Sequence, residues 1–260
     1  MQISISLESP DSGSKPAGPA VVGWLLDQKE ATVIFDAPKR VRSVAVNRDH
    51  AKSASRCPAV INMESRYFEV KCPYDLQLQF MRDDKGKAQL KNLLGNDTPV
   101  RPKKLWELVH LVSENEWRYK DRPTLQLNLP YIFVSDEPVY LSQVAPFMHY
   151  SADPLPGTIF GGRFPINVWP RRLLWAFEWH DIAKPLVLKR GEPLFYVMFE
   201  TTPQERSVQL VEAEVTHELR QYLDMISGAV NYVNQTFGLF EAAEERRPPK
   251  LVSPVQRRQE

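Results

Sequence analysis

The chain has 260 residues, of which 43% are hydrophobic and 25% are charged. These fractions are those of an ordinary folded protein, so they exclude a wholly disordered or fibrous chain. The formal net charge of +1 creates no global field toward a phosphate backbone or an anionic membrane, and the sequence therefore does not favour nucleic acid as a partner.

The N-terminus begins with a strand-like segment, ISISL, and continues into residues 8–20, which are rich in Pro, Ser and Gly. It lacks the basic region and the apolar core of a secretory signal. No segment of the sequence approaches the roughly 18 consecutive apolar residues that span a bilayer. We therefore expect residues 1–20 to form a strand and a flexible arm of a cytoplasmic protein that makes no membrane contact.

Residues 21–240 are predicted to form a single β-rich domain. Short segments rich in Val, Ile, Phe and Tyr are separated by turn residues, which is typical of short strands. Pro130 interrupts one of these segments and places it at a sheet edge or at a bend. Residues 105–112 could form a short helix or a strand, because the apolar run is too brief for its period to decide. The predicted strands are 31–36, 40–46, 66–71, 75–81, 124–134 and 208–215.

Cys57 and Cys72 are the only cysteines, and each precedes a proline. In a reduced intracellular chain they would be small buried hydrophobes. A disulfide between them is the alternative, and it requires two strands to bring their Cβ atoms together. The sequence leaves both possibilities open.

Residues 170–200 contain the greatest concentration of reactive side chains. Large apolar residues alternate there with a second set that includes Glu178 and His180, which indicates a strand with one apolar face and one polar face. Residues 189–192 follow, and Gly191 can supply a positive φ, so we expect a hairpin that joins strands 186–188 and 194–199.

A helix is predicted over residues 216–237, where the apolar period changes to three and four residues. Thr216 is a plausible N-cap, and Gly238 is a reasonable stop. The apolar stripe consists of Leu219, Tyr222, Leu223, Ile226, Val230, Val233 and Phe237. Residues 241–260 are charged and contain prolines, so we expect a tail that is disordered or held by a neighbouring subunit. The expected fold class is therefore mainly β (α+β), an antiparallel sandwich or distorted barrel of short strands with one long C-terminal amphipathic helix.

One set of residues resembles a metal site. Glu178 and His180 project from the same side of the predicted strand, Asp181 follows, and His149 lies in a loop that could fold over that face. Two histidines and a carboxylate can hold a divalent metal with open positions for oxygen and substrate. The alternatives are an acid–base pair without a metal and an ordinary surface ion pair.

The tryptophans allow two interpretations. Trp175 and Trp179, with Phe177 between them, are expected to fill a β core, because large aromatic residues usually do so. Alternatively, some of Trp169, Trp175 and Trp179 could line a small-molecule pocket.

Three parts of the sequence resemble uncharacterised proteins of tailed bacteriophages and some bacteria. These parts are RCPAVINMESRYFEVKCPYDLQLQF, WAFEWHDIAKPLVLKRGEPLFYVMFE, and a helix followed by RRPPKL. The resemblance covers most of the chain and implies no activity. Separately, LKRGEP before an apolar strand is similar to the strand entry of jelly-roll and β-clip proteins, which implies a β architecture.

The leading functional hypothesis is a non-enzymatic binding or assembly protein, phage-encoded if the resemblance holds. It would use the helix, the N-terminal arm and the C-terminal tail to contact a protein partner or further copies of itself, in the host cytoplasm or in a virion. A cupin-like or oxygenase-like metalloenzyme that uses His149, Glu178, His180 and Asp181 is one alternative. A small-molecule binding module with an aromatic pocket is the other.

Overall fold

The computed structural model describes residues 18–28, 33–42, 56–95, 102–149, 154–204, 206–229 and 236–256. They form a mainly β structure with few helices, as predicted. The strands are β1 (Ala20–Leu26), β2 (Lys39–Arg40), β3 (Tyr67–Lys71), β4 (Leu76–Arg82), β5 (Ala88–Asn92), β6 (Val109–Leu111), β7 (Thr124–Asn128), β8 (Tyr131–Ser135), β9 (Tyr140–Val144), β10 (Gly157–Ile159), β11 (Gly162–Pro165), β12 (Leu174–Trp179), β13 (Leu186–Leu188), β14 (Pro193–Glu200) and β15 (Val208–Glu212). The helices are α1 (Pro58–Arg66), α2 (Pro102–Leu108), the 3-10 helix η3 (Glu114–Glu116), α3 (His217–Ala229) and α4 (Thr236–Glu245).

The strands form four sheets, and in the described part of the chain none of them closes into a barrel. The strand orders are β15-β1-β8, β10-β12-β7-β6, β11-β9-β14-β3-β2 and β13-β4-β5. Neighbouring strands are antiparallel except for β1 and β15, which are parallel. That parallel pair departs from the antiparallel expectation, and the long intervening chain makes it possible.

The predicted strands match the structure unevenly. The segment 124–134 divides at Pro130 into β7 and β8, which belong to different sheets, so the expected bend is confirmed. Residues 105–112 contain both predicted possibilities, because α2 ends at Leu108 and β6 follows directly. Residues 33–36 are not a strand, and 31–32 and 43–46 lie outside the described residues.

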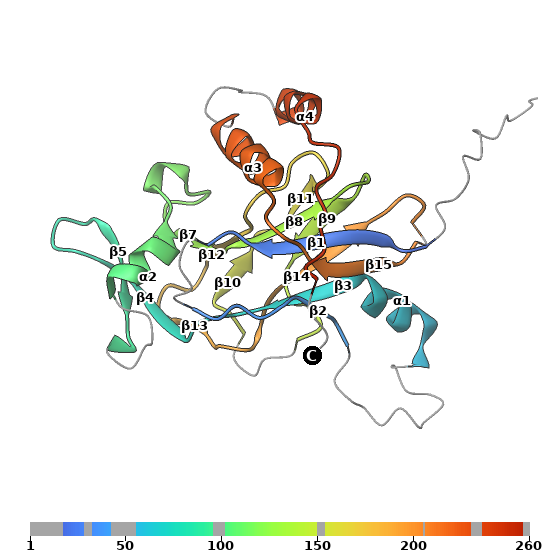
Figure 1. The fold of residues 1–260 in the computed structure, drawn as a ribbon. Helices are drawn as coiled ribbons and strands as arrows, with labels where there is room; N and C mark the ends of the chain where they lie inside the picture. The colour runs from blue at the N-terminus through green and yellow to red at the C-terminus, as the bar shows by residue number, and fades with distance from the viewer. Residues whose placement is uncertain are drawn as a thin grey trace, which may run out of the picture.

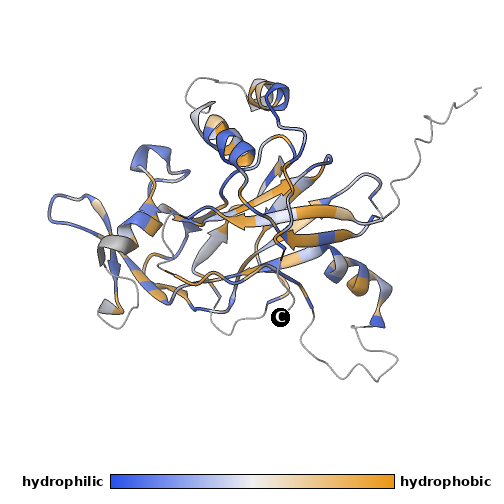
Figure 2. Cartoon of the chain, viewed as in Figure 1, coloured by the Kyte–Doolittle hydropathy of each residue, from blue (hydrophilic) through white to orange (hydrophobic). Residues whose placement is uncertain are grey.

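Two hydrophobic clusters lie on opposite faces of β8. Tyr131 and Phe133 enter the larger cluster, whereas Ile132 and Val134 enter the smaller one, because successive side chains of a strand point to opposite faces. The larger cluster fills the space among the four sheets. Figure 1 shows α3 and α4 together on one side of β1, with β3 on the other. Figure 2 shows the apolar residues gathered in the central strands and the hydrophilic residues in the outlying turns.

The turn at residues 189–192 does not form the expected hairpin. Gly191 has the positive φ (86°) that the sequence predicts. However, β13 pairs with β4, while β14 pairs with β3 and β9 in another sheet. The prediction was wrong about pairing because a turn residue reports the local change of direction and carries no information on which neighbour each strand will meet.

The single long helix expected over 216–237 is not present, and two short helices are found instead. The start is as predicted, since the N–H of Leu219 donates to Thr216 Oγ1 at 3.2 Å, a side-chain N-cap. Farther along, Tyr222 Oη donates to the carbonyl of Ala243 at 3.0 Å. In one continuous helix these residues would lie roughly 30 Å apart, so the chain must reverse between α3 and α4. The stripe residues Val230 and Val233 lie outside the described residues.

The described part of the expected tail, residues 241–256, packs on the same chain. Leu251 and Val252 are buried in the smaller cluster beside α3. Their backbone N–H groups donate to Asp136 Oδ1, and Ala213 forms a β-bridge with Pro254. This differs from the expected disordered or subunit-bound tail, because the two apolar residues find a complementary surface within their own chain.

Candidate functional site

A groove of about 940 Å³ is lined by residues of β10, β13 and the segment 145–149. Its volume is near the upper end of the roughly 300–1,000 Å³ usual for ligand sites. Five of its lining residues are prolines, which have no backbone N–H to donate. The groove is therefore mainly apolar, with its hydrogen-bonding groups confined to a few places.

Two residues that line this groove are exposed apolar residues. Phe147 is 53% exposed and Val187 is 39% exposed. The ring of Phe147 is nevertheless held in place, because it makes edge contacts with Tyr67 at 5.2 Å and with Tyr196 at 5.6 Å between ring centroids. An exposed apolar group that is already fixed loses little freedom when a partner covers it, so this wall of the groove is preorganised for binding.

A few charged residues also line the groove. Lys184, Lys189 and Glu192 line it together with His149 and the hydroxyl-bearing Thr158. Lys184 Nζ lies 3.1 Å from Asp181 Oδ2 in an exposed ion pair. Ligand-binding sites are usually lined mainly by apolar residues, and a small number of polar or charged groups fix the orientation of the ligand.

Cys72 also lines the groove but is not a candidate nucleophile. It is buried, and its Sγ donates to the carbonyl of Tyr74 at 3.2 Å. Burial raises the pKa of the Cys72 thiol to about 12, so the reactive thiolate is absent at neutral pH. Cys57 is exposed, and both thiols are free, so the alternative disulfide is not formed.

A polar cluster next to β10 consists of Glu178, His180, Arg122 and Tyr119. We call it the Glu178 cluster. Glu178 Oε1 lies 2.9 Å from His180 Nε2 and 3.6 Å from Arg122 Nη1. The guanidinium of Arg122 lies 4.5 Å from the centroid of the Tyr119 ring, a cation–π contact. Glu178 is only 4% exposed, and its Oε2 is buried with no hydrogen-bond partner among the residues that the structure describes. Such an oxygen is uncommon in folded proteins and marks a place where a water, an ion or a ligand group can bind.

The Glu178 cluster is adjacent to the groove. Glu178 lies directly opposite Thr158 in the register of β12 and β10, and Thr158 lines the groove. The carbonyl of Pro156, another lining residue, accepts the N–H groups of His180 and Asp181 at 2.9 and 3.0 Å. One strand therefore separates the cluster from the groove.

The four predicted metal ligands are not gathered around one point. Glu178 and His180 meet, but Asp181 pairs with Lys184, and His149 lies in the lining of the groove. In the part of the chain that the structure describes, no three His, Cys, Asp or Glu side chains could hold a metal ion together. The metal site stays a prediction, and the nearby guanidinium of Arg122 disfavours a divalent cation at Glu178.

Sequence reasoning missed Arg122 and Tyr119 because they precede β7, far from β12 in the chain. The pairing of Glu178 with Thr124 in β7 brings the Tyr119–Arg122 turn to this position, and no sequence spacing predicts that register. By contrast, the expected burial of Trp175 and Trp179 agrees with the structure, where both are fully buried in the larger cluster. Neither they nor Trp169 line the groove.

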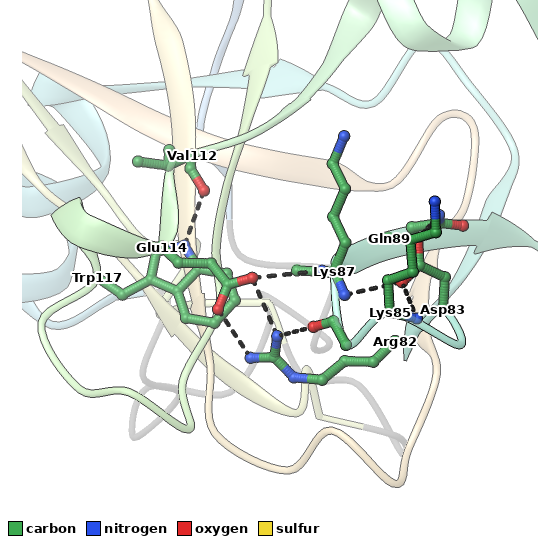
Figure 3. A network of polar contacts seen from close by, with 10 residues as sticks. Arg82, Asp83, Lys85, Lys87, Gln89, Val112, Glu114 and Trp117 are labelled. Atoms are coloured by element: carbon green, nitrogen blue, oxygen red, sulfur yellow. Dashed lines mark hydrogen bonds and ion pairs between the residues drawn. The ribbon is translucent and has the colours of Figure 1, made fainter.

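A second polar network, shown in Figure 3, has a structural role. Glu114 accepts two hydrogen bonds at 3.0 Å from Arg82 and one at 3.3 Å from the N–H of Ala88. Arg82 also lies over the rings of Phe80 and Trp117. The network therefore holds η3 against the β4–β5 hairpin and covers the outer edge of β5 at Ala88.

Comparisons with protein-family models, with curated proteins and with solved structures found no match for this chain. The resemblance to bacteriophage proteins stays a prediction, as does the cytoplasmic location. Among the residues that the structure describes, no helix combines the length and the apolar composition that crossing a membrane requires.

Proposed function

We propose that this chain is a non-enzymatic binding protein that holds a segment of a partner protein in the groove. The observation that carries the proposal is the pair of exposed apolar side chains, Phe147 and Val187, within a mainly apolar groove. Exposed apolar patches of this kind, rimmed by polar residues, are typical of protein interaction sites.

The groove replaces the helix as the proposed contact element. The predicted stripe of α3 is not available to a partner, because Leu219, Tyr222, Leu223 and Ile226 are buried within this chain. The residues 246–256 are also packed on the chain, as described above. Binding through the groove leaves both hydrophobic clusters intact, so it needs no rearrangement of the fold.

The proposal is tested with short random-sequence peptides displayed as a library. Peptides selected on the protein are synthesised, and their affinities are measured by fluorescence polarisation for the wild type, Val187→Arg and Ile182→Arg. Ile182 is a matched control, because it is an exposed aliphatic residue of similar exposure (38%) that does not line the groove. We expect Val187→Arg to weaken binding by about tenfold or more, which is roughly 1.4 kcal/mol, and Ile182→Arg to leave it unchanged.

Two outcomes would reject the proposal. One is a library that yields no peptide with measurable affinity for the wild-type protein. The other is a set of peptides that bind both arginine variants as well as the wild type, because such peptides would occupy another surface. Sedimentation of the free protein would show whether a second copy of the chain is itself the partner.

A second candidate function is acid–base or metal-assisted chemistry at the Glu178 cluster. The buried Oε2 of Glu178, which has no hydrogen-bond partner in the described part of the chain, favours it, since such groups are enriched at functional sites. Elemental analysis tests for a bound metal by comparing the metal content of the purified wild-type protein with that of His180→Ala. Stoichiometric iron, zinc or manganese that is lost in the variant would support this candidate, and no metal after attempted reconstitution would eliminate the metalloenzyme.

A further inference from the structure

Strand β10 is an edge strand, so half of its backbone N–H and C=O groups point away from the neighbouring strand β12. It stands at the end of the order β10-β12-β7-β6. The N–H of Phe160 donates to Ala176 and that of His180 donates to Pro156, both at 2.9 Å. Since backbone groups alternate in direction along a strand, Thr158 also faces β12, while the N–H and C=O groups of Gly157 and Ile159 point outward.

The groove runs along this outer edge. The side chain of Thr158 points to the opposite face of the sheet from Gly157 and Ile159. All three residues line the groove, so the groove lies beside this strand, and its outer edge is the side that has no neighbouring strand in the described sheet. Two N–H donors and two C=O acceptors of β10 are therefore presented along it.

A second edge strand, β13, also lines the groove. Its neighbour in the sheet is β4, which contains Gln77. The N–H of Leu93, the residue after β5, donates to the carbonyl of Gln77 at 2.7 Å, so the backbone groups of Gln77 face β5 and not β13. Val187 is the register partner of Gln77, and its own backbone groups therefore point away from β4. Residues of two edge strands thus line the groove, and Val187 of β13 adds an exposed apolar side chain.

The charged residues of the groove favour an occupant that has an acidic side chain near Lys189. Lys184 is already paired with Asp181, which leaves Lys189 and Glu192 as the other charged residues of the lining. Electrostatic complementarity of this kind selects the partner and its register more than it adds affinity.

We propose that an extended segment of a partner protein that has at least one acidic residue adds to the outer edge of β10 as a further strand. Its backbone would bond to Gly157 and Ile159, its apolar side chains would contact Phe147 and Val187, and an acidic side chain would lie near Lys189. This mode of recognition, in which main-chain bonds supply affinity and side-chain contacts supply selectivity, is common at exposed sheet edges. The inference rests on the proposed function and specifies how the groove is used.

The backbone contacts are tested with peptides selected as described above. A series of synthetic copies is made in which each backbone amide is methylated in turn, which removes one N–H donor and leaves every side chain in place. We expect methylation at alternate positions to weaken binding by about tenfold or more and methylation between them to have little effect. Hydrogen exchange followed by NMR should show the amides of Gly157 and Ile159 becoming protected when the unmodified peptide binds.

The contact at Lys189 is tested with Lys189→Glu, which should weaken binding of a selected peptide that has an acidic residue by about tenfold. Lys120→Glu is the control, because it makes the same change at an exposed lysine outside the groove. Peptides that are sensitive to Val187→Arg but indifferent to backbone methylation, with no protection of Gly157 and Ile159, would overturn strand addition alone. Failure of every peptide to bind would overturn the proposed function as well.

Discussion

The two cysteines occupy opposite environments, and their reactivity should differ accordingly. Cys57 is exposed, whereas the thiol of Cys72 is buried with its pKa raised to about 12. In the native protein at pH 8 we expect dithiobisnitrobenzoate to react with Cys57 alone, because only a thiolate attacks this reagent. In denaturant both thiols should react. Native Cys57→Ser should therefore be inert, and rapid labelling of that variant would contradict the burial of Cys72.

Asp27 connects two elements through its carboxylate. It forms ion pairs with Arg172, which precedes β12, and with Arg220 of α3. Burial raises the pKa of Asp27, but the two arginines outweigh burial and hold the pKa below its ordinary value. A carboxyl whose pKa is lowered in the folded state stabilises the protein above its unfolded pKa, and this contribution disappears as the pH falls through the folded pKa.

Asp27→Asn should therefore lower the free energy of unfolding at pH 7 by about 1 kcal/mol. The difference from the wild type should shrink on acidification below about pH 4, where the unfolded carboxyl becomes protonated. Urea unfolding at a series of pH values measures this. Asp224→Asn removes the same charge from an exposed position on α3 and should have little effect. An equal loss at pH 7 and at pH 2 would contradict the ion-pair explanation.

Gly157 is required by close packing in β10. A Cβ at this position would lie 2.0 Å from the carbonyl oxygen of Glu178 and 2.6 Å from Phe177 Cζ. Gly157→Ala should therefore displace β10 and lower the free energy of unfolding by about 2 kcal/mol or more. Gly162→Ala is the control, since a Cβ there meets nothing within 4 Å. Thermal unfolding of both variants provides the comparison, and a neutral Gly157→Ala would show that β10 lies farther from β12.

At the scale of elements, burial on both faces explains the continuous apolar sequence of β8. Every residue of β8 is buried, and alternate side chains enter the two clusters. Such strands read as uninterrupted apolar runs, so their position in a core is predictable while their alternation is not. β12 is different, because large aromatic residues alternate there with Leu174, Ala176 and Glu178, so the period of two is visible in the sequence.

The helix α3 should depend on its predicted stripe. Leu223 is 5% exposed and lies in the smaller cluster, so Leu223→Ala should cost about 2–5 kcal/mol through lost burial and the cavity that remains. Gln221→Ala changes an exposed residue of the same helix and should be close to neutral. Urea denaturation measures both. Similar midpoints for the two variants would mean that the stripe does not contribute to the core.

At the scale of the molecule, the C-terminal segment should behave as part of the fold. Leu251 is 1% exposed, whereas Val255 in the same segment is 36% exposed. Leu251→Ala should therefore lower the free energy of unfolding by about 2–5 kcal/mol. Val255→Ala should change it by less than about 1 kcal/mol. The melting temperatures of the two variants check this prediction. Equal melting temperatures would show that the C-terminal segment does not contribute to the stability of the fold.

The candidate site shows how far sequence reasoning reaches. Glu178 and His180 can be paired from sequence, because residues two apart in a strand share a face. The burial of Glu178 and its contact with Arg122 could not be predicted, since they depend on the register between β12 and β7. The groove was also missed, because Phe147, Val187 and the edge of β10 come from three separate segments.

The sequence by itself determined the mainly β character, the alternation of β12, the core position of Trp175 and Trp179, and the capped, amphipathic start of α3. All of these depend on interactions between residues close in the chain, which periodicity and capping residues record. Only the tertiary structure decided the four sheets, the parallel pairing of β1 with β15, the reversal after α3 and the groove lined by residues of two edge strands. These features depend on which distant surfaces bury most apolar area together, and a local pattern shows which face is apolar without showing what it will meet.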